Sequence, residues 1–125
     1  MIDHISVGVS DLDRSAKFYE ATLAALGLTR LVTRRRTVGF GKAYPEFWIN
    51  LREGMAPVAP ESGVHICLRA KTTAEIDAFH AAALAVGGAS ESAPGIRPHD
   101  RVRYYAAFVV DPDGNRIEAV TFPAE

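Results

Sequence analysis

Two histidines and one glutamate are the side chains in this sequence with the clearest potential for chemistry. His4 opens a short alternating stretch near the N-terminus, and His65 opens a similar stretch later in the chain. Glu118 lies between two apolar residues, in a run that otherwise has the composition of a strand. Two neutral imidazoles and one carboxylate can hold a divalent metal ion and leave positions open for water or for two substrate oxygens. Each residue can equally be an ordinary strand residue. The choice between the two interpretations depends on whether the predicted strands bring the three side chains together.

An internal repeat relates the two histidines. An offset of 61 residues places His4 on His65, and an offset of 68 residues further along places Asn50 on Glu118. The difference between the offsets, seven residues, falls in a loop around 92–100. The sequence therefore predicts one domain, 1–125, built from two modules at about 1–57 and 63–125.

Each module has the same predicted order of elements, which is strand, helix and three further strands. Helices are expected at about 12–26 and 74–86, where apolar residues recur every three or four positions. A serine or aspartate caps the first helix, a threonine–glutamate capping box begins the second, and glycines end both. Strands are expected at about 3–9, 28–34, 37–42, 46–52, 64–69, 89–92, 103–111 and 115–122.

The predicted fold class is α+β. Each βαβββ module is too small to bury a good core alone, so we expect the two to pair into a curved mixed sheet, a partial barrel, with the helices outside. Strand alternation puts His4, His65 and Glu118 on the faces opposite the apolar residues of their strands. If the sheet curves, these three side chains converge in one concave groove.

Composition and charge exclude several classes of function. The net charge of −1 gives no electrostatic support for binding nucleic acid, and the one basic run, 34–36, is short enough to be a solvated hairpin edge. No apolar run is long enough to span a membrane and the N-terminus lacks the pattern of a secretion signal, so we expect a cytoplasmic protein without a membrane partner. The single cysteine, Cys67, excludes an internal disulfide.

Over essentially its whole length the chain resembles the glyoxalase/bleomycin-resistance/extradiol-dioxygenase group, the vicinal oxygen chelate superfamily. The resemblance rests on the stretches DHISVGVSDLDRSAKFYEATLAALGL, GVHICLRA and YYAAFVVDPDGNRIEAV. That family pairs βαβββ modules, and its metal enzymes hold a divalent ion with residues at four equivalent strand positions, which here are His4, Asn50, His65 and Glu118. The resemblance thus implies that Glu118 is a metal ligand and a catalytic carboxylate, with Fe, Mn, Zn, Ni or Co as candidate ions. It also implies a homodimer in which the ligands come from one chain or from two.

Asn50 departs from the pattern of glyoxalase I-like enzymes, which tend to carry a glutamate at this position. An amide oxygen can be a weak ligand but cannot take up a proton, so Asn50 is expected to be a fourth ligand, a pocket residue or a support for the other ligands. Further candidate pocket residues follow from strand parity or from their place in the extra loop. They are Trp48, Cys67, Arg97, His99, Tyr104 and Phe108, for which an aromatic core, a buried filler or a plain surface loop are the competing interpretations.

Three classes of function on a small-molecule substrate remain open. The first is a metal-dependent lyase, isomerase or group transferase, in which the metal polarises two neighbouring substrate oxygens. The second is a ring-cleaving dioxygenase, which the same ligand set suits. The third is a metal-free binding protein like the bleomycin-resistance proteins, which is disfavoured because such a binder has no need of two histidines and a glutamate on matched strand faces.

Overall fold

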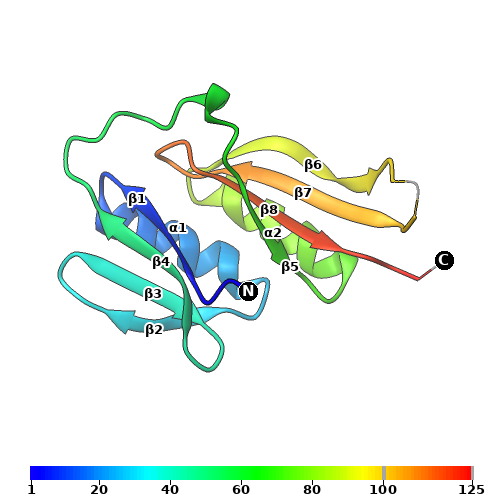
Figure 1. The fold of residues 1–125 in the computed structure, drawn as a ribbon, viewed down its shortest axis with the longest axis horizontal. Coiled ribbons are helices and arrows are strands. Elements are labelled where there is room, and N and C mark those ends of the chain that lie inside the picture. The colour runs from blue at the N-terminus through cyan, green and yellow to red at the C-terminus, as the bar shows by residue number, and fades with distance from the viewer. Residues whose placement is uncertain (100, 125) are drawn as a thin grey trace.

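The structure is a computed structural model, and it describes residues 1–99 and 101–124. Both halves show the expected order of one strand, one helix and three strands (Figure 1). The first half contains β1 (Ile5–Val9), α1 (Leu12–Ala24), β2 (Thr29–Thr33), β3 (Thr37–Gly41) and β4 (Pro45–Leu51). The second contains β5 (Ile66–Arg69), α2 (Thr73–Ala85), β6 (Ala89–Arg97), β7 (Tyr104–Val110) and β8 (Arg116–Thr121), after a short 3₁₀ turn, η1 (Pro60–Ser62), in the connection.

The strands form two four-stranded mixed sheets, one per half. Their orders are β1-β4-β3-β2 and β5-β8-β7-β6, so the first strand of each half pairs in parallel with the last, and the other pairs are antiparallel. The α+β class with repeated βαβββ units and curved sheets is therefore confirmed. The described strands do not close into a barrel.

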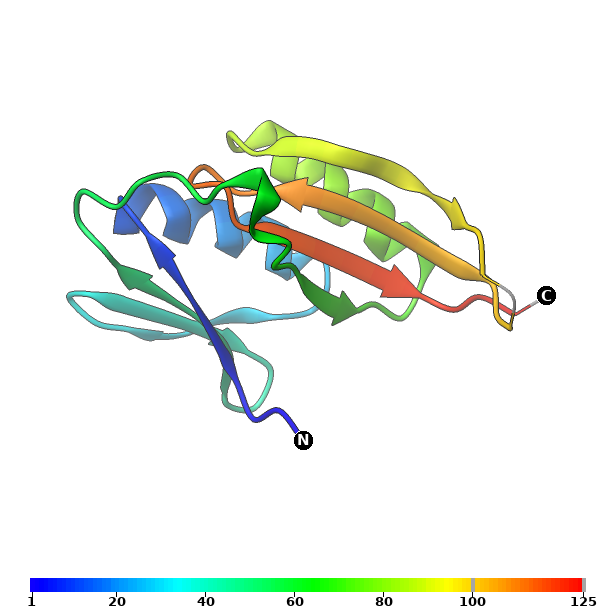
Figure 2. The ribbon, with the colours of Figure 1, turned by 45° about the horizontal axis from the view of Figure 1, so that its top comes forward.

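The two helices cover one side of the sheets and pack against each other (Figure 2). The helix starts follow from their caps. Asp11 accepts a hydrogen bond from Arg14 N at the start of α1, and Thr72 and Glu75 form a complete capping box at the start of α2.

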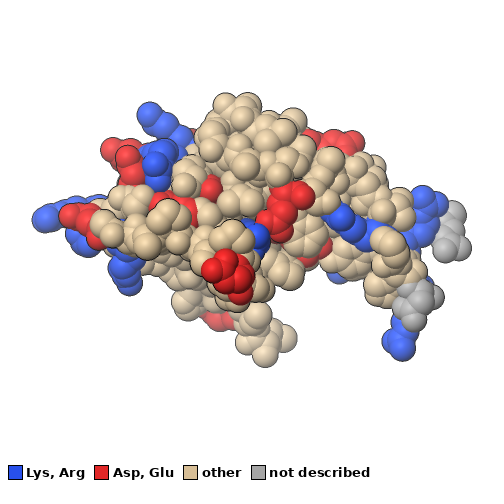
Figure 3. Space-filling model, turned by 90° about the horizontal axis from the view of Figure 1, so that it is seen from above, with Lys and Arg blue, Asp and Glu red and all other residues tan. Residues whose placement is uncertain are grey.

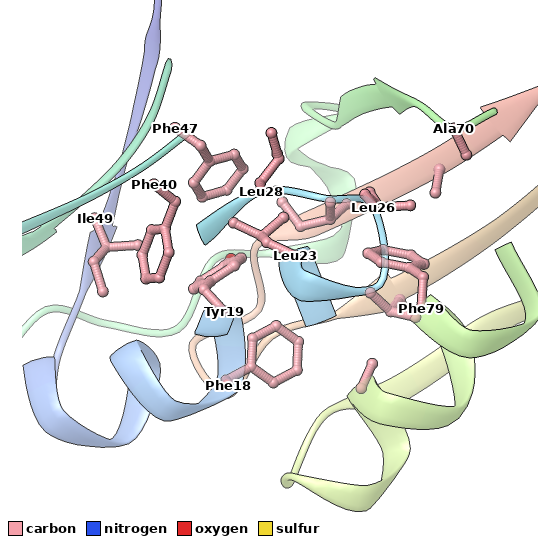
Figure 4. Packing of buried hydrophobic residues seen from close by; sticks show 14 of the residues in the cluster. Phe18, Tyr19, Leu23, Leu26, Leu28, Phe40, Phe47, Ile49, Ala70 and Phe79 are labelled. Carbon is pink, nitrogen blue, oxygen red and sulfur yellow. The ribbon is translucent and has the colours of Figure 1, made fainter. Parts of the chain in front are cut away.

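One hydrophobic cluster joins the two halves. The ring of Tyr19 on α1 lies 4.9 Å from both the Phe18 ring and the Phe47 ring of β4, measured between centroids. Phe79 of α2 belongs to the same cluster, and Figure 4 shows α1 between the first sheet and α2. The two halves therefore share one hydrophobic core.

The turn before β8 ties the second half to the first through polar contacts. Asn115 Nδ2 donates to the carbonyl of Gly8 at 2.9 Å, and Asp113 accepts from both the backbone N–H and the hydroxyl of Ser10. Tyr19 donates its phenolic O–H to Asp111 at 2.6 Å. These bonds fix where β8 begins, and hence where Glu118 lies relative to α1.

β6 is longer than the strand expected at 89–92, because it continues to Arg97. Its ladder with β7 is interrupted twice, and the second interruption, between Ser92 and Gly95, contains Pro94. A proline has no N–H to give to a ladder, so it is tolerated where the register shifts. Arg97 is therefore the last residue of a strand rather than a loop residue, and position 100 of the expected loop lies outside the described residues.

Acidic and basic side chains are interspersed on the face seen in Figure 3. Among the described residues, no helix is both long and apolar enough to cross a membrane.

Candidate functional site

The strongest pair of functional side chains is His65 and Glu118. His65 directly precedes β5, and Glu118 lies in the middle of β8, which pairs with β5 in parallel. His65 Nε2 lies 3.2 Å from Glu118 Oε1. The Glu118 side chain is only 2% exposed whereas that of His65 is 45% exposed, so the imidazole stands between a buried carboxylate and solvent.

Three neighbours complete the surroundings of Glu118. Tyr104 of β7 donates its O–H to Glu118 Oε2, which fixes the rotation of the carboxylate and leaves Oε1 directed at His65. Phe108 pairs with Glu118 across the β7–β8 ladder, and its ring meets the His65 ring edge-on at 5.4 Å between centroids. Cys67 pairs with Glu118 across the β5–β8 ladder.

The Cys67 thiol and the Tyr104 hydroxyl, both next to Glu118, have raised pKa values. Partial burial raises the pKa of the Cys67 thiol to about 12, with the charge of the Glu118 carboxylate as the next cause. Desolvation, followed by the hydrogen bond to Glu118, raises the pKa of the Tyr104 phenol above its ordinary value. Cys67 and Tyr104 are therefore neutral near pH 7, and neither side chain serves as an anionic nucleophile.

The first half contributes a second set of donors. The His4 side chain is 54% exposed, and its Nδ1 lies 2.6 Å from an Asp3 carboxylate oxygen. Asn50 donates through Nδ2 to Ser6 Oγ at 2.7 Å and to the Val7 carbonyl at 3.0 Å. Its Oδ1 is buried and accepts no hydrogen bond from the described residues. Trp48 lies on the same face of β4 as Asn50.

The structure brings some of the expected residues together and leaves others apart. His4, His65 and Cys67 line one pocket of about 500 Å³ that both β1 and β5 border. Within 1–99 and 101–124, however, no three His, Cys, Asp or Glu side chains lie close enough to hold a metal ion. His65 and Glu118 thus form a pair in the second half, whereas His4 contacts Asp3 and Asn50 contacts Ser6 and Val7 in the first.

The pair fits the geometry of two ligands to one ion. Two donor atoms that each lie about 2.1 Å from a metal are about 3.0–3.4 Å apart for angles between octahedral and tetrahedral. The 3.2 Å between His65 Nε2 and Glu118 Oε1 falls within this range. The free Oδ1 of Asn50 is a further oxygen donor with no partner among the described residues, which is compatible with a ligand or with a contact to substrate.

Aromatic rings and arginines extend the face around the pair. The His99 ring stacks on the Tyr104 ring at 6.0 Å between centroids, and the Arg97 guanidinium lies 5.3 Å from the Phe108 ring centroid. Arg69 lies 4.5 Å from the ring centroid of Phe122, two residues that sequence reasoning did not include. Arg69 could have been included, because the strand alternation of 64–69 puts it on the same face as Cys67.

A family model for the glyoxalase/bleomycin resistance protein/dioxygenase superfamily matches residues 1–119. The chain belongs to this superfamily. Members of the superfamily generally bind a divalent metal ion, often form dimers and bind small molecules. No curated protein matches the chain.

Solved structures of the superfamily agree with the fold. A glyoxalase/bleomycin resistance protein from Albidiferax ferrireducens T118 is 36% identical, with a TM-score of 0.85, and the match covers 96% of this chain and 98% of that one. A glyoxalase-related enzyme from Fulvimarina pelagi is 18% identical, with a TM-score of 0.72, over 96% of this chain and 86% of that one. A glyoxalase I mutant from Zea mays is 24% identical, with a TM-score of 0.72, over 94% of this chain and 44% of that one. The last two likenesses concern the fold alone.

Proposed function

We propose that this superfamily member is a divalent-metal-dependent enzyme, a lyase, isomerase or group transferase, acting on a small substrate with two neighbouring oxygens. His65 and Glu118 are the proposed ligands in the second half, and His4 is the proposed ligand from the first. The observation that carries the proposal is the 3.2 Å separation of His65 Nε2 and Glu118 Oε1, with the carboxylate oriented by Tyr104. His65 and Glu118 would hold a divalent ion there, and that ion would supply Lewis-acid polarisation of the substrate oxygens.

The side chains of the site have separate roles in this proposal. Tyr104 holds Glu118 in the rotamer that directs Oε1 toward His65. Glu118 is the proposed catalytic base as well as a ligand, because it is the one carboxylate of the proposed ligand set and Asn50, its counterpart in the first half, cannot accept a proton near neutral pH. Phe108 packs edge-on against His65 and supports the orientation of its ring beside Glu118.

A homodimer is part of the proposal. His4 is half exposed and lies outside a three-ligand cluster with His65 and Glu118 in the described residues. It can complete the ligand set either after a shift within one chain or by approach of the partner subunit's His4. Light scattering at micromolar concentration should give twice the 13.5 kDa chain mass, and the monomer mass would contradict the dimer.

The proposed metal site is tested by metal content. Protein purified without chelators should carry close to one equivalent of a divalent metal by elemental analysis, and His65→Ala should lose it while staying folded. His80→Ala is the matched control, because His80 lies on α2, where its Nε2 contacts Ser90 Oγ at 2.7 Å. Equal metal content in the wild type and in His65→Ala would refute the site.

Two alternatives differ in what they require. A ring-cleaving dioxygenase uses the same two histidines and glutamate, so metal identity and oxygen consumption with a catechol would distinguish it. A metal-free small-molecule binding protein is favoured by one observation, the separation of His4 from the His65–Glu118 pair. For such a protein, His65→Ala would change ligand affinity without any change in metal content.

A further inference from the structure

Arg97 borders the site on the side of Phe108. It is the last residue of β6 and pairs with Tyr104 in the β6–β7 ladder, so it shares a sheet face with the residues around Glu118. The guanidinium carbon lies 5.3 Å from the Phe108 ring centroid, and the same ring lies 5.4 Å from the His65 ring. One aromatic ring therefore separates the charge of Arg97 from the proposed ligand pair.

The hydrogen bonding of Arg97 is incomplete in the part of the chain that the structure describes. Nη2 donates to the Ser92 hydroxyl, and Nε is buried without an acceptor. No carboxylate pairs with this guanidinium among the described residues. A buried N–H donor without a partner is unfavourable, and a partly buried cation without an anion is more so. Other arginines of the chain do pair with carboxylates, namely Arg14, Arg30, Arg36 and Arg116.

The contact with Phe108 explains which part of Arg97 is available. An aromatic ring attracts a guanidinium through its charge but supplies no oxygen acceptor, so the contact with Phe108 does not replace a hydrogen-bond partner for the N–H groups. These N–H groups match the paired oxygens of a carboxylate or a phosphoryl group in a way that a lysine cannot.

We propose that Arg97 binds an oxyanion of the substrate, so that the site selects small anionic molecules. This inference rests on the proposed function. It adds that the substrate carries an anionic group, which His65 and Glu118 alone do not indicate. The oxyanion binds the terminal N–H groups of Arg97 that Ser92 leaves free, because the buried Nε is out of reach of a ligand. The rest of the substrate extends along Phe108 toward His65 and Glu118. A carboxylate and a phosphonate share the required chemistry, and the experiment below distinguishes them.

Two other arginines are weaker candidates for this role. Arg69 also lies over an aromatic ring, that of Phe122, but it is exposed and has no buried donor lacking a partner. Arg30 has a buried Nε without an acceptor, but its Nη2 is already paired with Glu20 at 2.9 Å. Arg97 combines a charge without a carboxylate partner among the described residues with a position beside Phe108, whose ring also contacts His65.

The test is an NMR titration of chelator-treated protein, in which no bound metal can supply the anion site. Acetate, methylphosphonate and neutral acetamide are added at constant ionic strength, and the Nε–H signals of arginine are followed. We expect acetate or methylphosphonate to shift the Arg97 signal with a dissociation constant in the millimolar range, and acetamide to leave it unchanged. A larger affinity for acetate assigns a carboxylate, and a larger affinity for methylphosphonate assigns a phosphonate or phosphate. Either result supports the subsite.

Variants separate this inference from the proposed metal site. Arg97→Gln should weaken anion binding at least tenfold, Arg97→Lys should give an intermediate loss, and Arg30→Gln should bind as the wild type does. Metal content of Arg97→Gln should be unchanged. The inference is overturned if the Arg97 signal does not respond to either anion, or if Arg97→Gln binds as well as the wild type. Loss of the metal site in other experiments would leave this result intact, because the titration is done without metal.

Discussion

Tyr19 and Asp111 are joined by a 2.6 Å hydrogen bond that links α1 to the turn before β8, across 92 residues of sequence. Both side chains are buried, and the same carboxylate also accepts from Asn115 Nδ2 and from the backbone N–H groups of Asp113 and Asn115. This network holds the strand that carries Glu118 in place against the first half of the molecule.

Removing the phenolic hydroxyl of Tyr19 should destabilise the protein. In Tyr19→Phe the buried Asp111 carboxylate loses a donor, and we expect the free energy of unfolding in urea to fall by about 1–3 kcal/mol. Tyr105→Phe is the matched control, because Tyr105 donates to Asp77 at the same 2.6 Å but at an exposed position. Equal losses in the two variants would contradict the structural role of the buried bond.

Asp111 should also leave a signature in the pH dependence of stability. Burial is the largest cause of its raised pKa and outweighs the hydrogen bonds that lower it. Because the folded-state pKa lies above the unfolded value, protonated Asp111 stabilises the fold below the unfolded pKa, and this contribution is lost as pH rises through the folded pKa. A carboxyl ¹³C titration should give a midpoint above 3.8. As the pH rises through this midpoint, the wild type should lose stability relative to Asp111→Asn, because the asparagine side chain does not titrate. A stability difference that is constant with pH would contradict this assignment.

Cys67 should react slowly although it reaches the surface. With a pKa raised to about 12, its thiolate fraction at pH 8 is on the order of a thousandfold below that of an ordinary thiol. Alkylation by iodoacetamide in metal-free protein, followed by mass spectrometry, should be correspondingly slow. Glu118→Gln should speed it severalfold, because one cause of the raised pKa is removed, whereas Glu91→Gln should not. Rapid alkylation of the folded wild type would show that Cys67 is not held in its thiol form.

The amide at Asn50 should limit glyoxalase I-type activity. That isomerisation moves a proton between neighbouring carbons and needs a base near the substrate. Asn50 cannot serve as one, so Glu118 would have to bind the metal and move the proton unaided. We predict weak or no activity on the hemithioacetal of methylglyoxal and glutathione. Asn50→Glu should raise it if the pocket accepts glutathione, although it removes the donor to Ser6 and Val7 and should cost about 1–3 kcal/mol of stability. A wild-type kcat/KM of about 10⁶ M⁻¹s⁻¹ for this substrate would contradict this prediction.

Local patterns in the sequence predicted the elements well. The capping box of Thr72 and Glu75 and the glycines at 27 and 87, both with positive φ, mark the ends of the helices as expected. β6 was underestimated because its second half contains Pro94 and Gly95, which are typical of a loop. This half of β6 pairs with β7, which lies further along the chain. Pro94 is tolerated because the register of the β6–β7 ladder shifts there.

The sequence predicted which strand faces carry the site residues, but it did not predict the distances between them. Alternation predicted that His65 and Glu118 face the same way. His65 directly precedes β5, Glu118 lies in β8, and the parallel pairing of these strands brings the two together. His4 directly precedes β1 with the same parity, yet β1 belongs to a different sheet. The distance between the two sheets depends on how the helices pack against each other and against the sheets, and residue spacing along the chain carries no information about that.

The measurement that tests the central claim most directly is a crystal structure of the protein grown with one equivalent of zinc, with anomalous data collected at the zinc edge. The account predicts a single strong peak within about 2.0–2.3 Å of both His65 Nε2 and Glu118 Oε1. A peak at His80 or His99 instead, or no peak with His65 and Glu118 still in direct contact, would contradict it.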